Sequence, residues 1–94
     1  MDINKLVFRI HAIRRMFERK IDKEDVRKAL EGGEVIEKYE KDTPYPSCLV
    51  LGWVGLRPLH IVVAENREEK EQIVITVYEP AVSQWEEGFK RRKK

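Results

Sequence analysis

The chain has 94 residues, of which 38% are charged and 41% hydrophobic, and its formal net charge is +2. This length and composition predict one folded domain with a well-solvated surface. The last five residues are all basic, so the rest of the chain has 19 − 5 = 14 basic against 17 acidic side chains. The body is therefore slightly acidic, which argues against a protein that coats nucleic acid through a uniformly positive face.

Other classes of protein are disfavoured by what the sequence lacks. No apolar run approaches the roughly 20 residues that span a bilayer, so we expect no membrane association. The first residues contain no apolar stretch typical of a signal peptide, which predicts a cytoplasmic protein. Cys48 is the single cysteine, so neither an internal disulfide nor a cysteine zinc cage is possible.

The N-terminal third is predicted to contain one short strand and two helices. The strand covers residues 5–10, and apolar residues at helical spacing indicate a helix over residues 11–20. A second helix follows Asp22, which is a good N-cap with Asp25 at the third helical position. Two consecutive glycines, Gly32 and Gly33, predict its end.

After the glycines the apolar period changes from helical to alternating, which predicts strands. We expect them over residues 34–40, 48–54, 59–64 and 72–78. A last helix is expected from Ser83, because Ser83 and Glu86 form a capping-box pattern and Trp85 and Phe89 would share one helical face. Residues 90–94 are expected to form a flexible basic tail.

The order of elements predicts a single α+β domain over residues 1–94. Consecutive strands with short connections favour an antiparallel sheet of about four to five strands. Two N-terminal helices and a C-terminal helix would then pack against this sheet.

His60 lies in an apolar strand and is the first candidate for chemistry. Alternation puts His60 on the side of its strand that carries the smaller residues, and one pairing brings Thr76 and Tyr78 to the same face. Such a face is a shallow groove more often than a core, which would suit a catalytic histidine. The alternative, that His60 only bonds a carbonyl at the end of the sheet, stays equally open.

His11 and Arg15 are four residues apart at the start of the first predicted helix, with Arg14 beside them. They would share one helix face, where the helix dipole favours a neutral imidazole. From spacing alone, a solvated face without function is the better interpretation. No motif for a metal, a nucleotide cofactor or a serine nucleophile is present, so we expect no metal and no cofactor.

Several segments resemble the family catalogued as domain of unknown function 4258. The most specific are "HAIRRMFER", "PYPSCLVLG", "RPLHIVVA" and "VITVYEP", and the resemblance extends from about Arg9 to Arg92. Lys20 and Leu56 depart from the glycines that are usual at their positions. Members are commonly encoded beside YgiT-type zinc-finger proteins, as in MqsR-like toxin–antitoxin modules. The resemblance therefore implies a RelE-like fold, a toxin that cleaves messenger RNA, and a cognate antitoxin as partner.

Cleavage of RNA through its own 2′-hydroxyl requires a base, an acid and positive charge near the phosphate, but no metal. The candidate catalytic residues are His60, Tyr78, His11 and Arg15. The candidate RNA-binding residues are Arg14, Arg57, Tyr45 and Ser47, with Tyr45 placed to stack on a base. Two rival interpretations are a non-catalytic module that binds a partner protein and a regulator that binds nucleic acid through its basic tail. Cleavage specificity, ribosome dependence and oligomeric state are not determined by these patterns.

Overall fold

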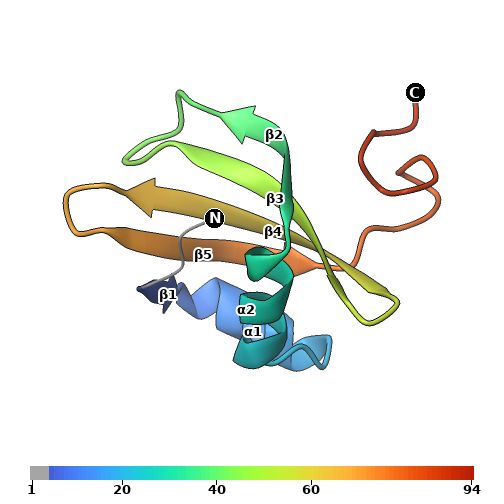
Figure 1. Ribbon diagram of the computed structural model, residues 1–94, viewed down its shortest axis with the longest axis horizontal. Coiled ribbons are helices and arrows are strands. Elements are labelled where there is room, and N and C mark those ends of the chain that lie inside the picture. The colour runs from blue at the N-terminus through green and yellow to red at the C-terminus, as the bar shows by residue number, and fades with distance from the viewer. Residues whose placement is uncertain (1–4) are drawn as a thin grey trace.

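The structure, a computed structural model, describes residues 5–94, which form a five-stranded sheet with two helices (Figure 1). The elements in chain order are β1 (Leu6–Phe8), α1 (Ile10–Glu18), α2 (Lys23–Glu31), β2 (Glu34–Tyr39), β3 (Ser47–Val54), β4 (Arg57–Asn66) and β5 (Glu71–Tyr78). The α+β class and the order of elements up to β5 agree with the sequence-based expectation.

The helix α2 begins where the sequence predicts. The backbone N–H of Asp25 donates to the Asp22 carboxylate at 2.9 Å, and the Asp22 N–H donates to the Asp25 carboxylate at 3.2 Å. This reciprocal pair satisfies two backbone donors that the first helical turn would otherwise leave unpaired. The helix α1 has no such cap, because Arg9 at its N-cap makes no side-chain bond to the helix.

The strand order in the sheet is β1-β5-β4-β3-β2. Strands β2 to β5 form the expected antiparallel meander, but β1 pairs with β5 in parallel, so the sheet is mixed. Both helices and three strands separate β1 from β5 in the chain. A connection of that length allows β1 to join the free edge of β5 in the parallel direction, which a short hairpin does not allow.

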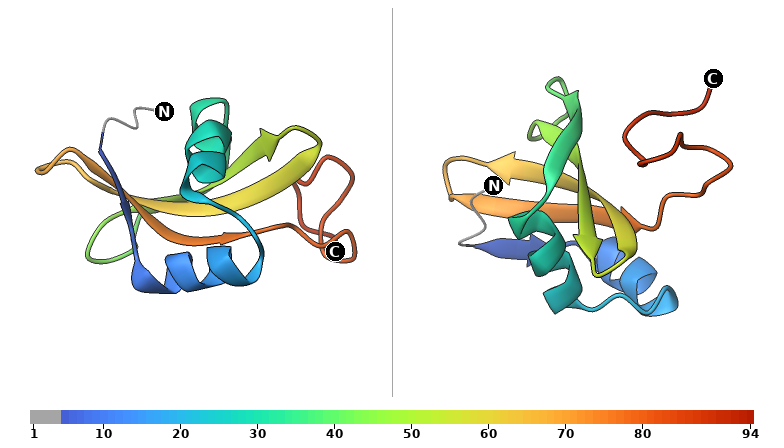
Figure 2. Two further views of the ribbon diagram at one scale, coloured as in Figure 1. Left: turned by 90° about the horizontal axis from the view of Figure 1, so that it is seen from below. Right: turned by 45° about the vertical axis from the view of Figure 1, so that its right-hand side comes forward.

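The expectation of a C-terminal helix is wrong. Residues 80–94 contain no helix and instead fold back on themselves, with an isolated antiparallel bridge between Trp85 and Arg92. Gly88 and Phe89 have φ values of 88° and 61°, which reverse the chain in the left-handed region that a helix does not use. A short isolated helix is marginal, whereas the folded-back segment buries Trp85 to 3% exposure. We call residues 80–94 the C-terminal strap (red in Figures 1 and 2).

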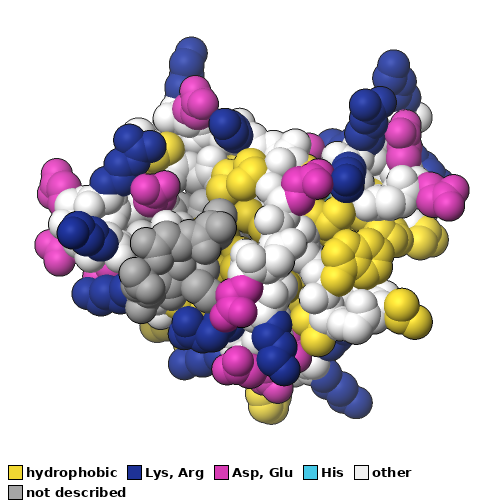
Figure 3. Space-filling view, viewed as in Figure 1, with side chains coloured by type: hydrophobic (Ala, Val, Ile, Leu, Met, Phe, Trp, Pro, Cys, Tyr) yellow, Lys and Arg dark blue, Asp and Glu magenta, His cyan; other side chains and the backbone are white. Residues whose placement is uncertain are grey.

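The core lies between α2 and one face of the sheet, and α1 closes it along β5. In Figures 1 and 2, α2 crosses the strands while α1 runs beside β5. Both helices contribute to one buried cluster, which comprises Ala12, Met16, Ile21, Val26, Ala29, Leu30, Val50, Leu59, Ile61, Val63, Val74 and Val77. On the molecular face shown in Figure 3, basic and acidic side chains are interspersed, without a broad area of one sign.

The helix α2 approaches β3 so closely that Gly52 has no room for a side chain. A Cβ at Gly52 would lie 2.2 Å from the backbone oxygen of Ala29 and 2.7 Å from its Cβ. Since both neighbours belong to the helix, they cannot move aside independently of it. The position therefore holds α2 against the sheet at backbone-to-backbone distance.

We expect Gly52→Ala to lower the free energy of unfolding by about 1–3 kcal/mol or more, because the added methyl pushes α2 away from β3. Gly32→Ala is the matched control, since a Cβ there meets nothing within 4 Å. Urea denaturation of the three proteins measures the difference. Equal losses in both variants would contradict the close contact.

Candidate functional site

The outer face of the sheet, opposite the core cluster, carries the polar groups of interest. Because side chains alternate along a strand, the outer face takes His60, Val62 and Ala64 from β4, while Leu59, Ile61 and Val63 enter the core. The register pairs His60 with Tyr78 and Val62 with Thr76. The expectation that His60, Thr76 and Tyr78 share one face is therefore correct.

Of the two interpretations of His60 that the sequence left open, the open groove is not found, whereas a bond to a carbonyl is. His60 is completely buried, at 0% exposure, because the C-terminal strap lies over it. Its Nε2 is 2.9 Å from the carbonyl oxygen of Phe89, and its Nδ1 is 3.2 Å from the hydroxyl of Tyr78. The Trp85 ring stands edge-on to the imidazole, with centroids 4.3 Å apart and an interplanar angle of 88°. Sequence patterns could not place this cover, because they assigned it to a helix.

The two contacts of the imidazole define its protonation state. A carbonyl oxygen only accepts, so Nε2 carries the hydrogen, and in the neutral ring Nδ1 accepts from the Tyr78 hydroxyl. Burial lowers the pKa of His60 below its ordinary 6.5, and this outweighs the bond to the Phe89 carbonyl, which raises it. Burial also raises the pKa of Tyr78 above its ordinary 10.0. At neutral pH a proton-accepting histidine thus touches a proton-donating tyrosine.

An ion pair holds the strap to β2 next to this histidine. Two guanidinium nitrogens of Arg92 lie 3.1 and 3.2 Å from the two carboxylate oxygens of Glu37, which also accepts from the Tyr39 hydroxyl at 2.5 Å. The bonds from Arg92 and Tyr39 lower the pKa of Glu37 below 4.5. The guanidinium also lies over the Trp85 ring, 4.6 Å from its centroid. We call Glu37, Tyr39, His60 and Tyr78 the outer-face cluster.

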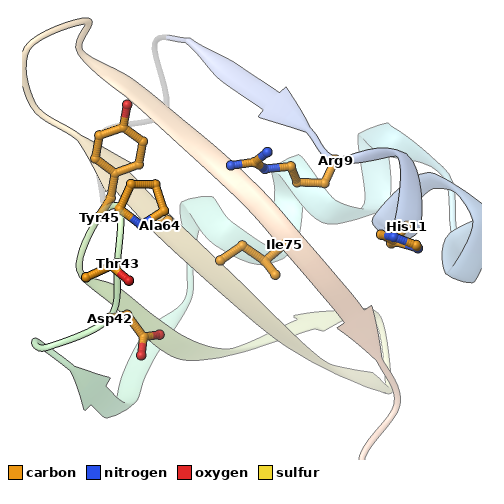
Figure 4. A pocket seen from close by; sticks show the side chains of 8 residues that line it. Arg9, His11, Asp42, Thr43, Tyr45, Ala64 and Ile75 are labelled. Carbon is orange, nitrogen blue, oxygen red and sulfur yellow. The ribbon is translucent and has the colours of Figure 1, made fainter.

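A second group of polar side chains surrounds an open pocket of about 330 Å³ (Figure 4). Arg9 and His11 approach it from the start of α1, and Asp42, Thr43 and Tyr45 approach it from the loop between β2 and β3. Ala64 and Ile75 form part of its floor. Ala64 is four residues from His60 on the same strand face, so the pocket opens on the outer face about 13 Å from His60 at 3.3 Å per residue.

The other predicted site residues do not converge on one place. Ser47 lies beside the open pocket through its 2.5 Å bond to Asp42. Arg15 forms an exposed pair with Glu18 at 3.8 Å, and Arg14 is exposed on the same helix. Arg57 pairs with Glu79 and donates to the carbonyls of Lys20 and Arg19, at 3.1 and 2.7 Å. Its contacts join β4 to the turn between the helices, which is a structural role.

Sequence reasoning did not assign several of these residues to a site. They are Glu37, Tyr39, Trp85 and Arg92 around His60, and Arg9, Asp42 and Thr43 around the pocket. Trp85 is expected only on the face of a helix, and Arg92 only in a basic run, which is usually a solvated chain end.

No group of three or more His, Cys, Asp and Glu side chains within residues 5–94 is arranged to hold a metal ion. No helix in the described part of the chain is long and apolar enough to cross a membrane.

The lowered pKa of His60 predicts a stability that depends on pH. Because the unfolded chain binds the histidine proton more readily than the folded one, the free energy of unfolding should fall as the pH drops through about 6.5. Above that pH the contribution is fully present. Urea denaturation between about pH 7.5 and about pH 5.5 measures it.

His60→Gln should flatten this pH dependence, whereas His11→Gln, which removes an exposed imidazole, should leave it in place. The assignment of the pH-dependent stability to His60 would be contradicted if the dependence disappeared in His11→Gln and persisted in His60→Gln.

No curated protein and no solved structure matches this chain. The model of the family described as "Domain of unknown function (DUF4258)" matches residues 8–79. The match spans both helices and strands β2 to β5, and it ends before the C-terminal strap. It covers well over half of the sequence, and the chain therefore belongs to the DUF4258 family.

Proposed function

We propose that this protein is a metal-independent endoribonuclease of the RelE/MqsR-like toxin class, with His60 and Tyr78 as its proton-transfer pair. The observation that carries the proposal is the 3.2 Å contact between the His60 Nδ1 and the Tyr78 hydroxyl. Burial lowers the pKa of His60 and raises that of Tyr78, so at neutral pH the imidazole is unprotonated and the hydroxyl keeps its proton.

This pair suits cleavage of RNA by its own 2′-hydroxyl. His60 takes the proton of the 2′-hydroxyl as its oxygen attacks the phosphorus, and Tyr78 gives its proton to the departing 5′-oxygen. The products are a 2′,3′-cyclic phosphate and a 5′-hydroxyl. The proton then passes from the His60 imidazolium to the Tyr78 phenolate along the hydrogen bond between them, which restores both groups.

The open pocket would hold the RNA beside the cleaved bond. The Arg9 guanidinium and the His11 imidazole suit a phosphate, and the Tyr45 ring, on the opposite side of the pocket, suits an unstacked base. Asp42 is bonded to Ser47, so its carboxylate is partly neutralised by a hydroxyl. Binding in the pocket and chemistry at His60 then use one continuous face of the sheet.

We expect His60→Gln and Tyr78→Phe each to reduce RNA cleavage by about 10²–10⁴-fold, the usual contribution of a proton-transfer group. Because His60 is buried, rates must be compared per folded molecule, with the folded fraction taken from denaturation curves. His11→Gln should weaken RNA binding more than it slows the chemical step. Wild-type cleavage should persist in EDTA and leave a 2′,3′-cyclic phosphate.

Equal rates of RNA cleavage per folded molecule in wild type and His60→Gln would show that His60 has only a packing role. Cleavage that stops in EDTA would exclude the metal-independent mechanism.

A toxin of this class requires an antitoxin, and α1 offers a surface for a protein partner. Ile10, Ile13 and Phe17 are 69%, 41% and 85% exposed, and their spacing places them along one stripe of the helix. Exposed apolar residues gathered on one element are typical of protein–protein contacts. The same stripe favours the second candidate function, a binding module without catalysis.

Co-expression with the product of a neighbouring gene, such as a YgiT-type zinc-finger protein, should give a complex that co-purifies. Phe17→Ser should abolish the complex with little loss of stability, because the ring is almost fully exposed. Leu56→Ser is the matched control, since Leu56 is 96% exposed on the turn between β3 and β4 and does not belong to the stripe on α1. Unimpaired growth on induction of the chain alone, together with no complex, would contradict the toxin assignment.

A further inference from the structure

The C-terminal strap closes the outer-face cluster from solvent. Trp85 is 3% exposed against the His60 ring, the Phe89 carbonyl accepts from His60, and the Phe89 ring lies 6.1 Å from that of Trp53. Trp85 and Phe89 thus occupy the space directly over the proposed proton-transfer pair. No RNA phosphate can reach Nδ1 of His60 while the strap lies there.

Two ion pairs, both exposed on the strap side, hold the strap to β2. Arg92 pairs with Glu37, and Lys90 pairs with Glu34 at 3.2 Å, with side chains 59% and 56% exposed on the strap. Ion pairs exposed to this degree contribute little, since water and salt screen them. Most strap residues other than Trp85 and Phe89 are exposed. Departure of the strap would expose Trp85 and break the bond between His60 and Phe89, but it would leave intact the core cluster, which contains no strap residue.

The boundary of the family supports the same division. The family match ends at residue 79, and the strap begins at residue 80. His60, Tyr78, Glu37 and Tyr39 all lie within the matched region. The shared domain thus builds the cluster, and the covering segment lies outside the region that defines the family.

We infer that the C-terminal strap is a removable cover, and that Trp85 occupies the seat of one unstacked base of single-stranded RNA. This inference rests on the proposed function. Trp85 occupies this place edge-on to the His60 ring, with centroids 4.3 Å apart and an interplanar angle of 88°, and an indole matches a purine in size and flatness. Unstacked bases contact aromatic and imidazole side chains in RNA-binding proteins. When the strap leaves, the Nε2–H that Phe89 releases becomes a donor for a phosphate oxygen.

The removable cover is tested by breaking the ion pair between the strap and β2. Arg92→Gln removes the contact with Glu37, and Arg91→Gln is the matched control, with the same charge change in the same segment. Modification of the histidines by diethyl pyrocarbonate reports their exposure, and His11, which is already exposed, serves as the internal reference. Glu37→Gln breaks the same pair from the sheet side, should Arg92→Gln fold poorly.

We expect Arg92→Gln to raise the modification rate of His60 by up to about fivefold, the effect of losing an exposed ion pair on an opening equilibrium. The rate at His11 should not change, and RNA cleavage should rise by a similar factor. Unchanged His60 modification in both Arg92→Gln and Glu37→Gln overturns the removable cover. Faster modification without any cleavage supports the cover and overturns the proposed function instead.

The base seat is tested by the fluorescence of Trp85 in a Trp53→Phe background, which leaves one tryptophan in the chain. A short single-stranded oligoadenylate with non-cleavable 2′-O-methyl sugars should shift the emission to longer wavelength, because Trp85 moves into water. An abasic oligomer of equal length and charge should produce no shift. The same shift with both oligomers overturns the base seat, since it would then reflect phosphate alone.

Discussion

The close approach of α2 to β3 at Gly52 determines which face of the sheet is available for function. With no side chain at that position, the Ala29 backbone lies directly on the strand, and Val26 and Leu30 fill the space on either side. The helix thereby covers the middle of one face of the sheet. His60, Thr76 and Tyr78 lie on the opposite face, away from this contact. The position of the outer-face cluster is thus a consequence of how tightly the core face is packed.

The parts of the fold that depend on local sequence were predictable. Asp22 and Asp25 are sufficient to begin α2, because the capping bonds join residues three apart. Alternation allowed His60 and Tyr78 to share one face, but only under one of the possible pairings of β4 with β5, which is the pairing observed. The parallel pairing of β1 with β5 could not be predicted from local sequence, because it depends on which edge of the sheet is free.

The site itself was only partly predictable, for a similar reason. Ser83 and Glu86 form a valid helix-start pattern, yet Trp85 gains more by burial against His60 than a short helix provides. The local pattern and the long-range contact compete, and the long-range contact prevails. Glu37 and Arg92 are 55 residues apart in the chain, so no spacing rule relates them. Burial of His60 therefore could not be read from the strand that contains it.

The strap's contacts also determine when it can form. The bond between His60 and Phe89 closes a loop of 29 residues, and the pair between Glu37 and Arg92 closes one of 55. Contacts of such separation cost more chain entropy than hairpin contacts do and are made only after the strands they join are in place. Until the strap has closed over β4, the side chain of His60 on the outer face has no cover. Closure of the strap is thus the step that removes His60 from water, and it depends on the last residues of the chain.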